Sequence, residues 1–315
     1  EATMMAIRAA RKYTDKEKIV KIEGGYHGSH EYVSVSVYTP AHKLNPAGPT
    51  AVPEYGGQPI NVSNEVFVVE YNDAIGMLDI LESNSDDIAC VIMEPVISSF
   101  GYTPASKDYL ETVRSKTREL GIVLIFDEVQ SFRLSSGGAQ EYFGVVPDMT
   151  ALGKIIGGGL AVGAFGGKRE IMDCFNPTDG GAEIAHAGTF NANPITMRAG
   201  MVVMQHLTPD VYSQINNLGE ELRAKLSAVF SELNITTQIT GIGSFFGIHF
   251  TENEISNYRD VITTDPTVKK AFFLGMLNEG ILLNGLSGSL NIFSTTENIN
   301  ELASAVRRVA IRLFK

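Results

Sequence analysis

The feature that most constrains the fold is a series of short apolar runs separated by amphipathic segments. The runs cover residues 65–70, 88–95 and 122–127, and the segments between them, 73–83 and 106–120, have helical periodicity. Continuous apolar runs of this length are typical of strands that are buried on both faces, and their alternation with helices is typical of a parallel sheet. The sequence therefore predicts an α/β domain whose mostly parallel, mixed sheet is flanked by helices.

The pattern changes near residue 205. The later elements that we expect are helices over about 210–232, 266–279 and 297–314 and strands over 236–240, 245–250 and 289–293. This mixture predicts a smaller α+β C-terminal domain. We place the domain boundary between residues 205 and 206, so that a large domain spans 1–205 and the C-terminal domain spans 206–315.

The first residues already have the periodicity of a helix, over residues 2–13, without an N-cap before it. We therefore expect further residues upstream of Glu1. A strand at 18–23 then runs into the glycine-rich turn 24–28. Residues 39–62 are rich in Pro, Gly and Asn and are expected to form a long loop, which in compact domains is often functional.

Composition excludes several classes of partner. The net charge of −11 argues against binding to nucleic acid. No apolar stretch approaches the roughly 20 residues that span a membrane. Only two cysteines are present, Cys90 and Cys174, and Cys90 lies in an apolar run as a core thiol would. We expect no disulfide framework, no metal site and a reducing, cytoplasmic compartment.

Two charged residues, Asp127 and Lys154, stand at the edges of apolar runs 27 residues apart. Asp127 ends a strand, where a carboxylate needs a partner. Lys154 is flanked by apolar residues and glycines, and desolvation favours the neutral amine that attacks carbonyl groups. A lysine that forms a Schiff base with an aldehyde, and a carboxylate that keeps a pyridine nitrogen protonated, suit pyridoxal phosphate chemistry. Taken alone, a surface lysine in a glycine-rich loop is the simpler interpretation of Lys154, and a carboxylate that accepts backbone amides explains Asp127 equally well.

Weaker signals accompany this pair. By strand alternation Val129 lies on the side of Asp127, whereas Glu128 points away and is expected to support the scaffold. Tyr26 lies in a glycine-flanked turn and can stack on a ring, although an ordinary turn aromatic is the simpler interpretation. Thr189 precedes a helix over 195–205 and can donate to a phosphate, although N-capping by Asn193 explains the same segment.

The order of these segments resembles that of class III, fold-type I aminotransferases, which depend on pyridoxal phosphate. The resemblance is greatest to the subgroup of glutamate-1-semialdehyde aminomutase and the β-amino-acid aminotransferases. It covers nearly the whole chain, and the lysine motif is highly specific. The matching motifs are Glu23-Gly-Gly-Tyr-His-Gly28, Phe126-Asp-Glu-Val-Gln130, Pro147-Asp-Met-Thr-Ala-Leu-Gly-Lys-Ile-Ile-Gly-Gly-Gly159, Gly163-Ala-Phe-Gly-Gly167 and His186-Ala-Gly-Thr-Phe-Asn-Ala-Asn-Pro194.

The resemblance implies a role for each matching residue. Lys154 would carry the cofactor and move a proton, and Asp127 would keep the pyridine nitrogen protonated. Tyr26 and Val129 would cover the two faces of the ring, with His27 beside it.

Two further cofactor contacts follow from the same resemblance. Gln130 would lie near the phenolic oxygen of the ring. Thr189 would reach the cofactor phosphate of the neighbouring subunit, so that a homodimer with shared active sites is expected.

Departures from the family bear on the substrate. The family's phosphate-binding Gly-Ser/Thr segment would lie upstream of Glu1. The segment from Glu94 to Phe100 lacks the Pro-Ile-Gln-Gly-Glu pattern of the ornithine and γ-aminobutyrate branch. The stretch Leu283–Asn291 lacks the active-site glutamate of the aminomutase, and it also lacks an Arg or Lys that would bind a carboxylate. Arg133 and the loop 39–62 are candidates for substrate contacts, with a surface arginine and a plain loop as the alternatives.

We expect an enzyme that transfers an amino group between an amine or amino acid, including β-amino acids, and a keto acid by a ping-pong route. The alternative is the aminomutase, which moves the amino group within one molecule and would make a plastid location possible. A third interpretation is a non-catalytic protein with the same fold, which an intact pair of Lys154 and Asp127 disfavours.

Overall fold

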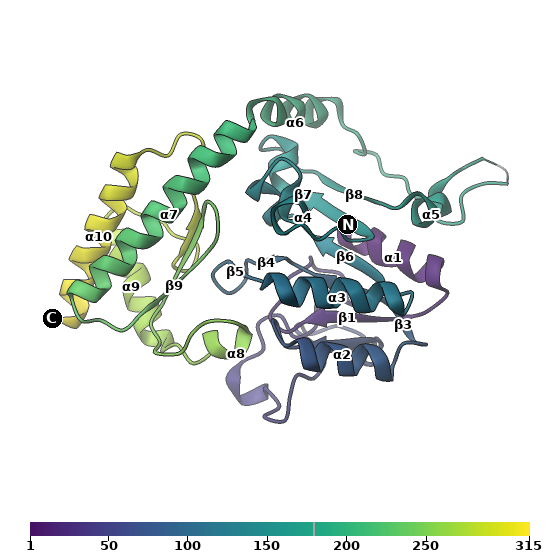
Figure 1. Ribbon diagram of the computed structural model, residues 1–315, viewed down its shortest axis with the longest axis horizontal. Helices are drawn as coiled ribbons and strands as arrows, with labels where there is room; N and C mark the ends of the chain where they lie inside the picture. The colour runs from purple at the N-terminus through teal and green to yellow at the C-terminus, as the bar shows by residue number, and fades with distance from the viewer. Residues whose placement is uncertain (179) are drawn as a thin grey trace. The chain divides into compact units, whose positions relative to one another are not determined.

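The computed structural model describes residues 1–178 and 180–315, which form two compact units (Figure 1). The first unit comprises Glu1–Pro95 and Ala105–Thr208, and the second comprises Val96–Pro104 and Pro209–Lys315. The second unit thus takes in the chain from Pro209 onward, and the domain boundary between residues 205 and 206 stays a prediction. The sequence did not indicate that Val96–Pro104 groups with the C-terminal unit.

The first unit is built on a six-stranded sheet with the strand order β2-β1-β3-β6-β7-β8. Its strands are β1 (Lys18–Ile22), β2 (Val66–Val69), β3 (Ile88–Met93), β6 (Val123–Asp127), β7 (Met149–Gly153) and β8 (Gly163–Gly167). All pairs are parallel except β7 with β8, which is antiparallel. The predicted α/β sheet, mostly parallel and mixed, is confirmed. The sequence prediction missed β7 and β8, since both are rich in small residues.

Helices and short 3₁₀ turns connect these strands. The helices are α1 (Ala2–Thr14), α2 (Ala74–Ser83), α3 (Lys107–Glu119), α4 (Gly138–Phe143), α5 (Arg169–Met172) and α6 (Pro194–His206). The 3₁₀ turns are η1 (Ala41–Lys43), η2 (Ile60–Glu65), η3 (Ser131–Leu134), η4 (Lys154–Gly157) and η5 (Asp173–Phe175). Side-chain caps start three of the helices, as Asp73, Ser106 and Asn193 accept hydrogen bonds from amides of the first turn.

The core of the first unit lies between α1 and one face of the sheet. Alternate residues of the strands, such as Ile19, Ile92 and Ile125, pack with Met5 and Ile7 of the helix. Figure 1 shows α1 beside β6. Cys90 belongs to this core as a free, buried thiol, as the sequence predicted.

The second unit contains a three-stranded antiparallel sheet of order β11-β10-β9. Its elements are β4 (Val96–Ile97), β5 (Thr103–Pro104), α7 (Pro209–Glu232), β9 (Gln238–Thr240), β10 (Phe245–His249), α8 (Tyr258–Val261), α9 (Pro266–Asn278), β11 (Ser287–Ser289) and α10 (Thr296–Phe314). The short strand predicted near 289–293 lies earlier in the chain, as β11, and residues 290–293 are not part of it. Asn291 accepts a hydrogen bond from the amide of Phe293 at 2.9 Å and turns the chain, which leaves the ring of Phe293 82% exposed.

Lys21 is a charged side chain buried inside the first unit. Its Nζ donates to the carbonyl oxygens of Ile22 at 3.0 Å, Val35 at 2.7 Å and Ser36 at 3.4 Å. Burial lowers the pKa of Lys21 to about 7, although nearby glutamates, chiefly Glu54, act in the opposite direction. This ammonium ties the segment that follows the 24–28 turn to β1.

Replacement of Lys21 should change how stability depends on pH. Between about pH 7 and 10.5 the unfolded chain holds a proton on Lys21 that the folded chain has lost, so the free energy of unfolding rises with pH. Lys21→Met removes this dependence. In urea denaturation the wild type should therefore gain up to about 1.4 kcal/mol per pH unit relative to Lys21→Met across this range.

Lys107→Met, on the exposed face of α3, controls for the loss of a positive charge. A wild-type advantage over Lys21→Met that stays constant from about pH 7 to pH 10 would contradict the assignment.

Candidate active site

Four neighbouring parallel strands, β1, β3, β6 and β7, end at one edge of the sheet, and a polar residue follows or closes each of them. Tyr26 and His27 follow β1, Glu94 follows β3, Asp127 closes β6 and Lys154 follows β7. Ligands of open parallel sheets bind outside the carboxyl ends of the strands. This edge is therefore the candidate site.

Asp127 is a buried carboxylate, 4% exposed, with a defined set of donors. Its Oδ2 lies 2.9 Å from Nδ1 of the buried His27, and its Oδ1 accepts from the amide of Val129 at 3.1 Å. An ionised carboxylate only accepts, so Nδ1 of His27 carries the shared proton. Thr3 holds the same turn by donating from Oγ1 to the carbonyl of His27 at 2.6 Å. The sequence placed His27 beside the ring but did not predict its contact with Asp127.

Lys154 has an unusual backbone. Its φ of 47° lies in the left-handed region, which is uncommon for residues other than glycine and which concentrates at functional sites. The residue is exposed, yet the protein around it removes enough water that desolvation lowers the pKa of its ammonium, against the opposing charges of Glu94 and Asp127. Lys154 thus loses its proton more readily than an ordinary lysine.

Tyr26 is held in place through its backbone. Its amide donates to Oε1 of Glu94 at 3.2 Å, and Glu94 is 3% exposed. The tyrosine itself is 41% exposed, so its ring has a face that a ligand can cover. Glu94 therefore positions the turn, a role that the sequence did not assign.

A cavity of about 500 Å³ opens at this edge of the sheet. The residues that line it are Val129, Gln130, Arg133, Lys154, Ile155, Gly159, Leu160 and Ala161. The structure thereby brings Val129, Gln130 and Lys154 together around one space, and it adds Arg133 to them. A cavity of this size suits a small organic ligand.

Comparison with known proteins decides the family. The family model for class III aminotransferases, "Aminotransferase class-III", matches residues 1–297. The chain belongs to the class III aminotransferase family. It is therefore a pyridoxal phosphate-dependent enzyme of fold type I.

The individual relatives are named either as aminomutases or as aminotransferases. A glutamate-1-semialdehyde 2,1-aminomutase of Methanococcoides burtonii is 40% identical over 99% of this chain and 72% of its own length. The crystal structure of an ω-transaminase from Sphaerobacter thermophilus is 39% identical, with a TM-score of 0.93 over 98% of this chain and 71% of the other. A β-phenylalanine aminotransferase structure from Variovorax paradoxus is 32% identical, with a TM-score of 0.84 over 99% and 68% of the two chains.

The residues at the strand ends suit the cofactor of class III enzymes. Pyridoxal phosphate needs an amine for its aldehyde and an anion for its protonated ring nitrogen. Lys154 lines the cavity, and its amine has a lowered pKa. The buried carboxylate of Asp127 lies close enough for its charge to oppose that lowering. Nε2 of His27 is buried and has no hydrogen-bond partner among the described residues, so the ring that contacts Asp127 can take one further polar contact.

Glu128 points away from the site, as strand alternation predicted. It is buried and accepts hydrogen bonds from Ser131 Oγ at 3.2 Å, from the amide of Ala139, and from the amide and the side chain of Gln140 at 3.2 and 3.1 Å. Burial raises the pKa of Glu128, and these donors oppose the shift. The residue thus joins η3 to α4.

Thr189 lies apart from the cavity in this chain. It is an exposed residue of the turn before α6, which Asn193 caps through the amides of Ile195 and Thr196 at 3.1 and 3.3 Å. The role that the family implies for Thr189 requires a second subunit, and it remains a proposal.

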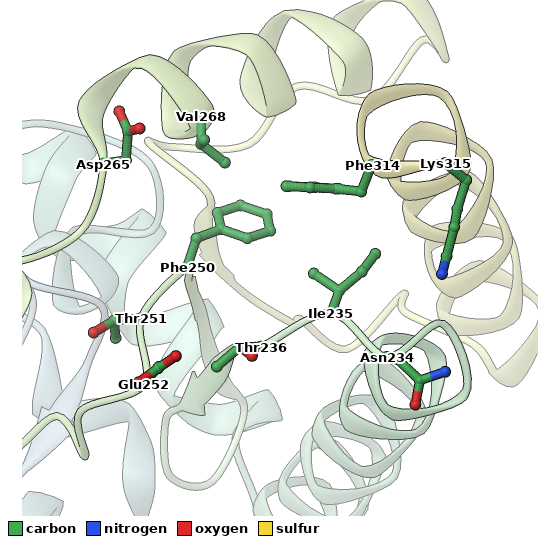
Figure 2. Close-up of a pocket in the computed structure, with 10 residues that line it drawn as sticks. All are labelled: Asn234, Ile235, Thr236, Phe250, Thr251, Glu252, Asp265, Val268, Phe314 and Lys315. Atoms are coloured by element: carbon green, nitrogen blue, oxygen red, sulfur yellow. The ribbon is translucent and has the colours of Figure 1, made fainter.

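A second pocket, of about 380 Å³, lies in the C-terminal unit (Figure 2). Figure 2 shows the side chains of Ile235, Phe250 and Phe314 around it. It continues the packing of an aromatic cluster, since the ring of Phe250 lies 5.4 Å from that of Phe314 and 5.0 Å from that of Phe272. This pocket contains none of the residues that suit the cofactor, so we place the candidate active site at the strand ends.

Residues 1–178 and 180–315 show no sign of a metal centre or of a membrane-spanning helix. No group of three or more His, Cys, Asp and Glu side chains lies close enough to hold a metal ion there. No helix in that part of the chain is both long and apolar enough to cross a membrane.

Asp148, at the other end of β7, provides a matched control for Asp127. It is also buried, accepts from the amide of Leu124 at 2.8 Å, and pairs with Arg114 at 2.9 Å and Lys168 at 2.8 Å. Burial alone would raise the pKa of Asp148, but these donors and cations outweigh it and leave the pKa lowered.

The two carboxylates should respond differently to replacement by Asn. We expect Asp127→Asn to retain pyridoxal phosphate, seen by its visible absorbance, and to lose turnover on the order of 100-fold, since the charge that holds the ring nitrogen protonated is gone.

Asp148→Asn should lose about 3 kcal/mol of stability near neutral pH and keep its turnover per folded molecule. Its deficit should shrink as the pH falls through the pKa of Asp148, because the wild type then loses the same charge.

Near-normal turnover in Asp127→Asn would contradict the role of that carboxylate. If turnover in both variants fell only in proportion to the fraction of unfolded protein, the distinction between the two carboxylates would be contradicted.

Proposed function

We propose that this class III enzyme is an aminotransferase that moves an amino group between an amine or amino acid, including β-amino acids, and a keto acid by a ping-pong route. The observation that carries the proposal is the cavity at the strand ends, where Lys154 with its lowered pKa lies under the influence of the buried Asp127. The ω-transaminase structure at 39% identity and the β-phenylalanine aminotransferase structure at 32% identity support the substrate class.

Pyridoxal phosphate supplies an aldehyde that condenses with amines and a ring that accepts the electron pair released at the substrate carbon. Lys154 acts as the proton carrier in our proposal, because desolvation favours its neutral amine. Its Nζ can take a proton from a substrate carbon and return it to a neighbouring atom.

The other residues orient the ligand. Asp127, fixed by His27 and by the amide of Val129, holds a negative charge that keeps a proton on a ring nitrogen placed against it. The side chain of Val129 and the ring of Tyr26 would cover the two ring faces. The amide group of Gln130, which lines the cavity, would hydrogen-bond to the phenolic oxygen of the ring.

A second candidate function is glutamate-1-semialdehyde 2,1-aminomutase, which the name of the relative at 40% identity favours. Against it stands the stretch Leu283–Asn291, which contains no acidic residue where the aminomutase carries its active-site glutamate. We therefore rank transfer between two molecules first.

Half-reactions separate the two functions. The holoenzyme mixed with an amino donor such as alanine or β-alanine should lose its visible absorbance and release a keto acid, and added pyruvate should restore the absorbance. Lys154→Ala should carry out neither step. A holoenzyme that reacts with glutamate 1-semialdehyde alone would overturn the aminotransferase proposal in favour of the aminomutase.

We propose further that the functional unit is a homodimer whose subunits share active sites, with Thr189 reaching the cofactor phosphate of the neighbouring subunit. Support comes from apolar side chains exposed on α6 and the turn before it. Phe190 is 81% exposed, Ile195 72% and Met201 42%. Apolar residues grouped in this way mark interaction surfaces.

Substitution of an apolar residue in this surface by a charged one tests whether the protein is a dimer. Phe190→Asp should shift the protein from dimer to monomer in sedimentation velocity and weaken cofactor retention. Ile75→Asp, at a residue that is 75% exposed on α2, is the control and should stay dimeric. A wild type that sediments as a monomer would contradict the proposal.

A cytoplasmic location is proposed from the thiol chemistry. Cys90 and Cys174 are both free and buried, which suits a reducing compartment. The plastid location considered with the aminomutase finds no support, since the relatives are archaeal and bacterial.

A further inference from the structure

The pocket of about 380 Å³ in the C-terminal unit lies where several elements meet (Figure 2). Its lining comes from the residues just after α7 and just after β10, from the start of α9 and from the end of α10. It shares no residue with the cavity that Lys154 lines, and its volume suits a small organic molecule. This C-terminal pocket is therefore a candidate for a second ligand site.

Aromatic and aliphatic side chains form one part of the lining. Figure 2 shows Phe250 and Phe314 beside the same space, together with Ile235 and Val268. The rings of Phe250 and Phe314 are tilted by 34° with their centroids 5.4 Å apart, and Phe314 is 36% exposed. Ring surface thus remains for a ligand. The face of an aromatic ring attracts apolar groups and also attracts cations, because the face carries the negative part of the ring's charge distribution.

Two carboxylates also line the pocket. Glu252 is exposed, and its side chain makes no hydrogen bond or ion pair to the described residues. Asp265 caps α9 by accepting at Oδ1 from the amide of Thr267 at 2.7 Å, which leaves its Oδ2 for a ligand. Lys315 adds a positive charge to the lining, but Figure 2 shows it across the pocket from both carboxylates, and it forms no ion pair with either of them.

The helix ends at the pocket add to its negative potential. α7 ends at Glu232, just before the lining residues Asn234 and Ile235, and α10 ends at Phe314. The C-terminal end of a helix carries a partial negative charge from its last carbonyl groups. The positive end of α9 is offset by its cap, Asp265. The pocket therefore favours a cation.

We propose that the C-terminal pocket binds a small organic cation with an apolar body. The apolar body would pack on the rings of Phe250 and Phe314, and the charge would lie against Glu252 and Asp265. This inference does not rest on the proposed aminotransferase function, because neither Lys154 nor the cofactor takes part in it.

Benzyltrimethylammonium is a suitable probe, since its nitrogen carries no hydrogen and cannot form a Schiff base with pyridoxal phosphate. Isothermal titration of the holoenzyme should show binding of this cation, with a Kd at least about 10-fold lower than that of the anion 3-phenylpropionate. The visible absorbance of the cofactor should stay unchanged during the titration.

Variants at the two carboxylates test where the charge lies. Glu252→Gln and Asp265→Asn should each raise the Kd of the probe about 2- to 5-fold, and the double variant should raise it about 10-fold. Asn at position 265 keeps the helix cap and removes the charge. Glu254→Gln, at an exposed glutamate of the same segment outside the lining, is the control and should match the wild type.

A larger side chain tests where the apolar body lies. Val268→Phe should fill the pocket and abolish binding of the probe, with circular dichroism and cofactor absorbance unchanged. The inference would be overturned by a wild type that does not bind the probe, by tighter binding of 3-phenylpropionate, by equal Kd values in wild type and the double variant, or by unchanged binding in a folded Val268→Phe. A wild type that binds the probe as expected but transfers no amino group would contradict only the proposed function.

Discussion

The parallel pairing of β1, β3, β6 and β7 is the constraint on which the site depends. Parallel strands that lie side by side end at one edge of the sheet, so residues far apart in sequence meet there without further folding. The registers of β3 with β6 and of β6 with β7 place Met93 beside Phe126 and Asp127 beside Ala151. Each of these strands thereby carries a polar residue at or after its end to the same edge.

Buried charges around that edge are the energetic consequence. A carboxylate such as Asp127 is costly to bury unless it is paired and hydrogen-bonded, and His27 and the amide of Val129 supply those contacts. Glu128 and Lys21 are satisfied in the same way, by donors of η3 and α4 and by backbone carbonyls. These groups hold the segments that would contact a ligand, so the stability of the first unit and the order of its site rest on the same contacts.

Much of the first unit could be predicted because its signals are local. The apolar runs that became β3 and β6 are continuous, and capping residues such as Ser106 mark where helices begin. β7 and β8, which are rich in small residues, lack that signal, since their order comes from pairing with neighbours rather than from their own side chains. The strand expected near 289–293 lies at Ser287–Ser289 instead, since the apolar pair Ile292 and Phe293 is exposed in the turn that follows it.

The contacts within the site were the least predictable part. His27 and Asp127 are 100 residues apart, and nothing near either residue indicates that their side chains meet. The same is true of Tyr26 with Glu94 and of Arg133 with Lys154, which share a cavity only because β6 and β7 are neighbours. Motif order named the candidate residues, whereas the tertiary structure shows which of them are in contact.

We propose that Lys154, the residue after β7, is the lysine that bonds to the cofactor. Reduction of the holoenzyme with borohydride makes that bond permanent, and digestion followed by mass spectrometry then locates it. Our account predicts that the added mass of the reduced cofactor appears on Lys154 alone. Modification at another lysine, such as Lys21 or Lys168, or a protein that binds pyridoxal phosphate without any such bond, would contradict it.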